Sequence, residues 1–192
     1  SLAFGGLLLA FAFFAPWRDR ANPITEIEEA LERGEFVPYF QPIIDLHTGR
    51  FSGAEVLIRW RKPDGTIVSP ATFIPLAESS GLVIELTRAL MRAVRDQAGA
   101  AIGKRPSFCV GFNVSALHFA GDKLVRDVRS IFAGSAIRMS QVIVEVTERQ
   151  PLENLTAARR VIASLQGLGC KVALDDVGVG HSGLSYILKL GV

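Results

Sequence analysis

The sequence lacks an excess of charge of either sign. Its 192 residues contain 21 lysines and arginines and 19 aspartates and glutamates, which gives a net charge of +2 at pH 7. A protein that binds nucleic acid through the phosphate backbone needs a basic patch or stripe. The charge balance therefore argues against a nucleic-acid partner.

Cysteine is also scarce, with two in the whole chain. Cys109 and Cys170 each lie inside an apolar run that is typical of a strand. Together they do not form a metal-binding pair. We interpret both as small buried core residues of a protein in a reducing compartment.

Charge is missing altogether from residues 1–17, SLAFGGLLLAFAFFAPW. A run of this length is at the short end of what spans a bilayer as a helix, and the chain begins with Ser1, so we expect the span to start further upstream. Trp17 suits an interfacial anchor, and Arg18 and Arg20 favour the cytoplasmic side for the sequence that follows. We therefore predict a transmembrane helix and its flank at residues 1–20. A signal peptide and a buried soluble helix are the alternatives.

Residues 21–35 are expected to form a short linker helix between the membrane and the domain. Thr25 and Glu28 have the spacing of a capping box, which predicts the first turn of this helix. Gly34 marks its expected end.

Strand-like and helix-like runs alternate from residue 36 onward. The expected strands are residues 36–44, 51–60, 108–116, 142–148 and 170–176, and the expected helices are residues 70–99, 116–133 and 154–167. The turn DLHTGR is too short for a crossover helix, so the first two strands are expected to pair antiparallel. The strand–helix–strand order of the rest predicts parallel strands with right-handed crossovers.

Two α/β architectures fit this order of elements: an open doubly wound sheet and a (β/α)8 barrel. A doubly wound sheet that binds a nucleotide carries a glycine fingerprint after its first strand. That fingerprint is missing here. The strand pattern alone does not decide between the two architectures.

Oxygen-bearing side chains recur near the same end of the expected strands, at Glu55, Asn113, Glu145, and the pair Asp175 and Asp176. In a parallel barrel the carboxyl ends of the strands meet at one mouth. Buried carboxylates gathered there are tolerated when cations are present. All donors are hard oxygens without histidine or cysteine, which favours Mg²⁺ or Mn²⁺ over zinc. The donor set predicts two ions that share an aspartate, an arrangement that activates water against a phosphate ester.

Each of these residues also has a structural alternative when taken singly. Glu55 could form an ion pair with Arg59, Asn113 could cap the helix that follows, Glu145 could be a solvated edge residue, and Asp175 could cap the glycine-rich loop. Their recurrence near the same end of separate strands favours a metal site over these single-residue alternatives.

The motifs YFQPI, GAEVLIRW, FNVSA, VEVTE and LDDVGVGHSGLSY, in this order, closely resemble the EAL-domain family of bacterial cyclic di-GMP phosphodiesterases. The resemblance covers most of residues 26–192, and EVL at 55–57 stands for the motif that names the family. It implies a modified (β/α)8 TIM-type barrel whose first strand is antiparallel, with this chain holding the N-terminal two-thirds or so at residues 36–192. It also implies metal-dependent hydrolysis of cyclic di-GMP to linear pGpG.

The resemblance also implies roles for individual residues. The implied metal ligands are Glu55, Asn113, Glu145, Asp175 and Asp176, with Asp176 shared with the second ion. Glu55, Asp175 and Asp176 are the implied catalytic residues. The implied substrate contacts are Gln41, Leu57 and Arg59. Glu148 resembles the glutamate that supports the loop after the two aspartates.

The chain departs from the family in the loop that helps to organise the second metal and the dimer. The usual DDFGTGYSSLSY is here DDVGVGHSGLSY, with changes at Val177, Val179, His181 and Gly183. The family's catalytic lysine would follow Val192, and Lys189 does not take its place, so we expect this fragment alone to be inactive.

Two functional hypotheses follow for the full-length protein. The first is a phosphodiesterase anchored in the bacterial inner membrane, with its catalytic domain in the cytoplasm and the homodimer usual in the family. The alternative is a weak or inactive EAL domain that binds cyclic di-GMP as a regulatory module. A scaffold for protein contacts at the membrane is a third reading, and no motif supports it.

Overall fold

The structure is a computed structural model that describes residues 22–147, 152 and 154–175. The expected transmembrane segment at residues 1–20, Glu148, Asp176 and the altered loop at 177–183 lie outside the described residues. Within the described ranges, no helix combines the length and the apolar character needed to cross a membrane.

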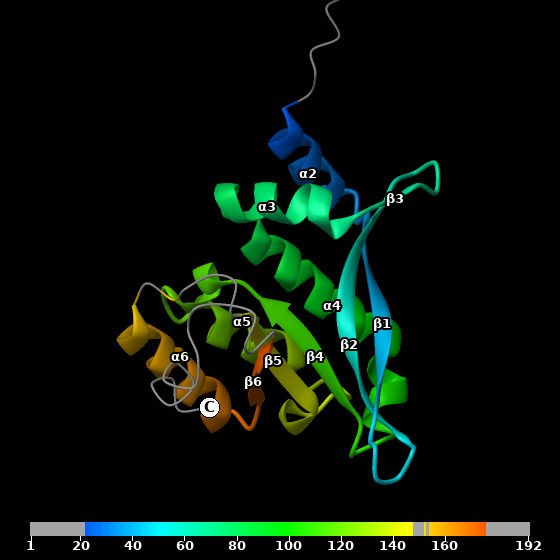
Figure 1. The fold of residues 1–192 in the computed structure, drawn as a ribbon, viewed down its shortest axis with the longest axis vertical. Coiled ribbons are helices and arrows are strands. Elements are labelled where there is room, and N and C mark those ends of the chain that lie inside the picture. The colour runs from blue at the N-terminus through cyan, green and yellow to red at the C-terminus, as the bar shows by residue number, and fades with distance from the viewer. Residues whose placement is uncertain (1–21, 148–151, 153, 176–192) are drawn as a thin grey trace, which may run out of the picture.

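The elements follow the expected order along the described chain, with one short strand, Ile67–Val68, that the sequence pattern did not predict (Figure 1). The strands are β1 (Phe36–Ile44), β2 (Phe51–Arg61), β3 (Ile67–Val68), β4 (Cys109–Val114), β5 (Val142–Thr147) and β6 (Lys171–Asp175). The α-helices are α2 (Pro23–Glu32), α3 (Pro70–Ser80), α4 (Val83–Gly103), α5 (Lys123–Phe132) and α6 (Leu155–Gly167). Two 3₁₀ turns, η1 (Ala116–Phe119) and η2 (Met139–Gln141), precede α5 and β5.

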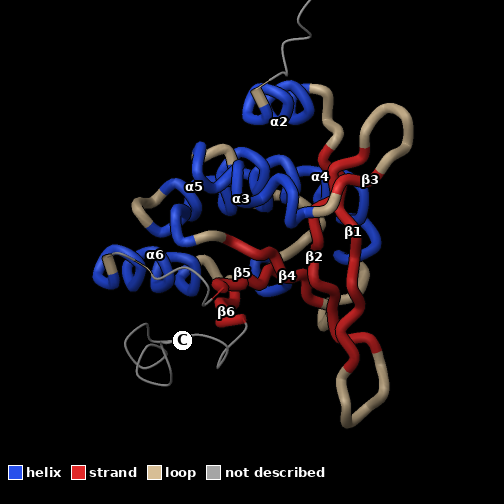
Figure 2. Tube along the Cα trace, turned by 45° about the horizontal axis from the view of Figure 1, so that its top comes forward, coloured by secondary structure: helices blue, strands red, loops and turns tan. Residues whose placement is uncertain are grey.

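The strands form one mixed sheet in the order β1-β2-β4-β5-β6, with β3 paired to β2. β1 is antiparallel to β2, whereas β2, β4, β5 and β6 are parallel. The short turn after β1 therefore has the consequence expected from the sequence. The β1–β2 ribbon runs along one side of the molecule, with α2 near the end that carries β3 (Figures 1 and 2).

The main core lies between the sheet and helices α4, α5 and α6. Alternate strand residues face it, for example Val142, Val144 and Val146 of β5, all buried. Helix residues such as Val94 and Val128 pack against them. Because side chains alternate along a strand, the residues between these valines lie on the opposite face of the sheet.

A second core covers the carboxyl end of β2. It joins residues of α2, α3 and the start of α4 to Phe36 and Trp60. The rings of Phe36, Trp60 and Phe73 lie 5.3 to 5.8 Å apart between centroids. Aromatic rings at such distances add stabilisation beyond the area they bury. This core attaches α2 to the sheet.

Several expected element ends are wrong. The capping box of Thr25 and Glu28 is not used, because α2 begins at Pro23 with Asn22 as its N-cap. The Asn22 Oδ1 accepts a hydrogen bond from the Ile24 N–H at 3.1 Å, and proline is favoured at the first helical position because it has no N–H to satisfy. The expected helix at 70–99 is two helices, divided at Gly81 with φ of +80°. The expected helix at 116–133 likewise begins as a 3₁₀ turn before α5.

His118 in η1 is a buried histidine, with 4% of its surface exposed. Its Nδ1 lies 3.2 Å from both the hydroxyl and the carbonyl oxygen of Ser115, and within the described part of the chain its Nε2 has no hydrogen-bond partner. Burial lowers the pKa of His118 from 6.5 to about 4. The folded chain therefore holds this ring neutral across a range in which the unfolded chain protonates it.

We expect the free energy of unfolding to fall as the pH decreases from about 6.5 to about 4, because the unfolded state binds the extra proton. A difference between pKa values of 6.5 and about 4 corresponds to a total loss of about 3 kcal/mol. The substitution His118→Gln should remove this contribution, which urea unfolding at pH 7, 5.5 and 4.5 would measure. The exposed His47 provides a matched control substitution, His47→Gln. Equal pH dependence in wild type and His118→Gln would contradict this assignment.

Candidate functional site

The strand register places the predicted site residues on one face of the sheet, opposite the main core. Gln41 pairs with Glu55 across β1 and β2, and Glu55 pairs with Gly111 of β4. Two residues further along β4, Asn113 pairs with Glu145 of β5. Residues opposite each other in register share a face, as do residues two apart in one strand. Asp175, the last residue of β6, pairs with Thr147 of β5 and so belongs to the same face by register.

Glu55 and Asn113 are in direct contact. The Asn113 Nδ2 donates a hydrogen bond of 2.5 Å to the Glu55 Oε1. The Asn113 Oδ1 is buried and has no hydrogen-bond partner among the described residues. A buried acceptor without a donor is costly, because it has lost its water without replacement. A cation at this oxygen would satisfy it.

Glu145 reaches the same place across Gly111. A Cβ built on Gly111 would lie 2.1 Å from the Glu145 Oε1 and 2.6 Å from its Cδ. The carboxylate thus occupies the space that a side chain at position 111 would need. Because Gly111 is the register partner of Glu55, the Glu145 carboxylate lies on the face that carries Glu55 and Asn113, over the strand position beside Glu55. Three oxygen-bearing side chains from separate strands therefore gather on one patch of the sheet.

The single-residue alternatives for Glu55 and Asn113 are wrong. None of the ion pairs among the described residues joins Glu55 to Arg59. Instead, the Arg59 guanidinium donates to the Ile58 carbonyl at 2.9 Å. Asn113 uses its amide on Glu55, and the N-cap position of η1 belongs to Ser115.

The predicted substrate contacts continue along the same face. Leu57 and Arg59 follow Glu55 at two-residue intervals in β2 and pair with Tyr39 and Val37 of β1. The Arg59 guanidinium carbon lies 5.6 Å from the centroid of the Tyr39 ring. A guanidinium over an aromatic face is both attracted and restricted in orientation. Arg59 is thus held at the carboxyl end of β2 on the side of the acidic residues.

The structure tests only part of the predicted metal site. Within the described ranges, no group of three His, Cys, Asp or Glu side chains stands close enough to hold a metal ion. Asp175 is described only by its backbone position, and Asp176 is outside the description. The two-ion site therefore stays a prediction, and the described residues contribute two carboxylates and one amide to it.

One cavity of about 290 Å³ lies away from the candidate site, beside the β1–β2 hairpin and residues that follow α4. Its lining is mostly apolar and includes Phe40, Phe51 and Phe108. None of the predicted ligands lines it, so the candidate site is defined by register and contacts.

Sequence reasoning missed two residues of this face, Tyr39 and Gly111. Tyr39 belongs to the motif YFQPI, and its two-residue spacing from Gln41 places both on one face. Gly111 lies inside an apolar strand, where glycine often marks a close approach of other atoms. That signal could have suggested the position over which Glu145 lies.

Comparison with known proteins identifies related sequences. Residues 24–192 match the family described as EAL domain. The chain is 38% identical over 184 residues to the probable cyclic di-GMP phosphodiesterase PdeG of Escherichia coli K12, covering 95% of this chain and 36% of PdeG. The chain thus spans about a third of the length of this curated relative.

Solved structures show the same fold. The PaMucR phosphodiesterase in complex with c-di-GMP is 30% identical, with a TM-score of 0.77 over 87% of this chain and 68% of that one. The Bacillus subtilis YkuI protein, which has an EAL domain and was solved with substrate c-di-GMP and calcium, is 22% identical, with a TM-score of 0.72 over 88% of this chain and 41% of that one. The predicted α/β fold of the TIM-barrel type is confirmed, and the sheet formed by the described strands is open.

Proposed function

The chain belongs to the EAL domain family, and on this basis we propose that its full-length protein hydrolyses cyclic di-GMP to linear pGpG in bacterial signalling. The observation that carries the proposal is the gathering of Glu55, Asn113 and Glu145 on one face of the sheet. The name of PdeG and the c-di-GMP complex of PaMucR support the same substrate.

The described residues fit a divalent cation. The buried, unpartnered Asn113 Oδ1 is an acceptor that a cation would satisfy, and the adjacent carboxylates are hard oxygen donors. We propose that Mg²⁺ or Mn²⁺, as two ions, is held by Glu55, Asn113, Glu145 and Asp175, with Asp176 shared between them. Bound ions of this kind lower the pKa of water and neutralise phosphate charge.

The chain's own residues would bind and orient the substrate. Arg59 offers a planar set of donors for a phosphate oxygen pair, and the Tyr39 ring beside it limits its orientation. Gln41 and Leu57 lie on the same face and would contact the remainder of the nucleotide. The hydrogen bond from Asn113 would keep the Glu55 carboxylate oriented toward the ions.

The experiment is to incubate the natural full-length chain with cyclic di-GMP and Mg²⁺ or Mn²⁺, and to follow pGpG by chromatography. Formation of pGpG that stops on addition of a chelator is the expected result. PdeG assayed alongside would serve as the reference. Absence of pGpG while the reference enzyme is active would overturn the proposed hydrolysis.

The altered loop at 177–183 favours a second candidate, a module that binds cyclic di-GMP without cleaving it. Titration calorimetry with Ca²⁺ in place of Mg²⁺ would separate the two candidates. Binding without product formation in Mg²⁺ supports the module, and absence of binding overturns it.

We also propose that residues 1–20 anchor the protein in the bacterial inner membrane with the EAL domain in the cytoplasm. The uncharged run and the arginines that follow it support this placement. Recovery of the full-length chain in the soluble fraction of lysed cells would contradict it. A homodimer is proposed from the family resemblance, and light scattering of the purified protein would test it.

A further inference from the structure

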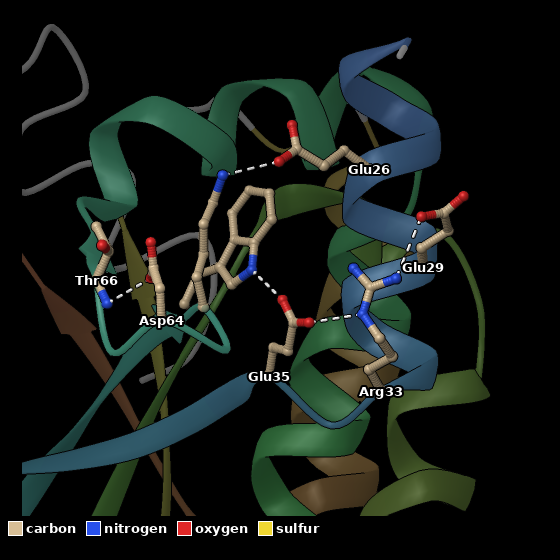
Figure 3. A network of polar contacts seen from close by, with 8 residues as sticks. Glu26, Glu29, Arg33, Glu35, Asp64 and Thr66 are labelled. Atoms are coloured by element: carbon tan, nitrogen blue, oxygen red, sulfur yellow. Dashed lines mark hydrogen bonds and ion pairs between the residues drawn. The ribbon is translucent and has the colours of Figure 1, made fainter.

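The buried carboxylate of Glu35 has no part in the proposed metal site. Glu35 lies between α2 and β1 and is 8% exposed. Its Oε2 accepts a hydrogen bond of 2.8 Å from the Trp60 Nε1–H, and its Oε1 accepts one of 2.6 Å from the Arg33 Nε–H (Figure 3). The hydrogen bond from Trp60 is the main reason that the pKa of Glu35 is lowered. A charged carboxylate is therefore joined to the indole near the end of β2.

A second contact joins the same strand end to α2. The Lys62 Nζ lies 2.8 Å from the Glu26 Oε1 and 5.0 Å from the centroid of the Trp60 ring (Figure 3). The Arg61 N–H also donates to the Glu35 carbonyl oxygen at 2.9 Å. We use the name Trp60 clasp for the group formed by Glu26, Glu35, Trp60 and Lys62.

The Trp60 clasp is itself well packed. Trp60 is 5% exposed and its ring lies against Phe36 and Phe73 in the second core. A buried indole N–H requires an acceptor, and Glu35 supplies it from a position 25 residues earlier in the chain. Removing the Glu35 carboxylate would leave this donor buried and unpaired.

Arg59 is the immediate neighbour of Trp60 and lies on the other face of β2. The clasp holds the strand from the core side, while Tyr39 contacts the guanidinium from the site side. A change in the backbone at position 60 would therefore alter the direction in which Arg59 points. Glu26 lies in α2 and Arg33 is its C-cap residue. Their contacts with Lys62 and Glu35 therefore connect α2 to the end of the strand that carries Arg59.

We propose that Glu35 is a positioning residue which, through Trp60, holds the end of β2 so that Arg59 faces a phosphate of the substrate. This inference rests on the proposed function for its ligand. If Glu35 has this role, movement of α2 would loosen the strand that carries Arg59 and would thereby lower the affinity for the substrate.

The first experiment measures catalysis and binding by the natural full-length chain. Glu35→Ala should raise KM for cyclic di-GMP, and its Kd in Ca²⁺, about tenfold, while kcat changes less than about twofold. Glu35→Gln keeps an acceptor for the indole and should recover most of the affinity. Glu28→Ala, which removes an exposed carboxylate from the same helix, is the control and should have no effect. A fall in kcat without a change in KM would overturn the positioning role.

A double-mutant cycle separates positioning from general destabilisation. In the background of Arg59→Ala, the further change Glu35→Ala should alter Kd less than about twofold, because the group that it positions is absent. An undiminished tenfold effect in that background would overturn the proposal.

Amide hydrogen exchange provides a measurement that does not depend on activity. Glu35→Ala should speed exchange in residues 57–62 at least about fivefold and leave residues 142–147 of β5 unchanged. Unchanged exchange at 57–62, or an equal increase in both segments, would overturn the positioning role whatever the ligand is. A wild-type chain that neither binds nor cleaves cyclic di-GMP would instead overturn the proposed function.

Discussion

Under the proposed function, replacing Glu55 by glutamine in the full-length protein is expected to reduce the rate of cyclic di-GMP hydrolysis at least about 1000-fold, since a metal ligand such as the one proposed here contributes several kcal/mol to the barrier. Glutamine retains an oxygen that can accept the hydrogen bond of 2.5 Å from Asn113. The fold should therefore be little affected, and the loss should come from the missing negative charge. The rate of pGpG formation at saturating Mg²⁺ or Mn²⁺ measures the effect.

The appropriate control for Glu55→Gln is Glu32→Gln, which removes one negative charge from an exposed position at the end of α2. Its activity should equal that of the wild type. Thermal unfolding of both variants in the presence of a chelator would show whether the fold is retained. Activity of Glu55→Gln within tenfold of the wild type would exclude Glu55 from the metal site.

Replacing Gly111 by alanine is expected to disrupt the candidate site by placing a side chain in the space that the Glu145 carboxylate occupies. The new Cβ would lie 2.1 Å from the Glu145 Oε1, so the carboxylate has to leave its present place over position 111. We expect about a 100-fold loss of hydrolysis and a 10- to 100-fold loss of metal affinity, as when a ligand loses its support. Because the crowded atoms are the end of a flexible side chain that can shift, the free energy of unfolding should change by less than about 1 kcal/mol. Isothermal titration with Mn²⁺ and the hydrolysis rate measure the first two effects.

Two further variants separate the effect on the site from the effect on the fold. Gly121→Ala introduces a Cβ at an exposed position where no other atom lies within 4 Å, and it should behave as wild type. The pair Gly111→Ala with Glu145→Ala removes the crowding together with the Glu145 carboxylate, and it should not regain activity. Full activity of Gly111→Ala would show that Glu145 does not need its present position.

The sequence was sufficient to predict most of the sheet. The expected strand at 36–44 is β1, and the turn DLHTGR correctly indicated its antiparallel pairing with β2. These predictions succeeded because hydrophobic runs and loop length are local properties, and loop length restricts how two neighbouring strands can pair. Helix ends were less predictable, since Asn22 displaced the expected cap and Gly81 divided a long helical run.

The candidate site was predicted in part. The sequence predicts that Glu55, Asn113 and Glu145 gather near one end of the strands, and the register places them on one face of the sheet, while their role as metal ligands stays a prediction. The assignment of Asp175, Asp176 and Glu148 stays a prediction, because their side chains lie outside the described part of the chain. The roles of Gln41, Leu57 and Arg59 toward the substrate are likewise untested, although their common face is established.

By itself, the sequence determined which strands carry the oxygen-bearing side chains and to which family the motifs belong. Only the tertiary structure showed that Glu145 lies over Gly111, that Asn113 turns its amide to Glu55, and that Glu35 holds Trp60. The physical reason is that side-chain alternation and turn length depend on neighbours in the chain. The hydrogen bonds named above join residues 25 and 58 positions apart, and the place of Glu145 depends on the absence of a side chain at Gly111. Such contacts arise when separate elements pack, and no local pattern encodes them.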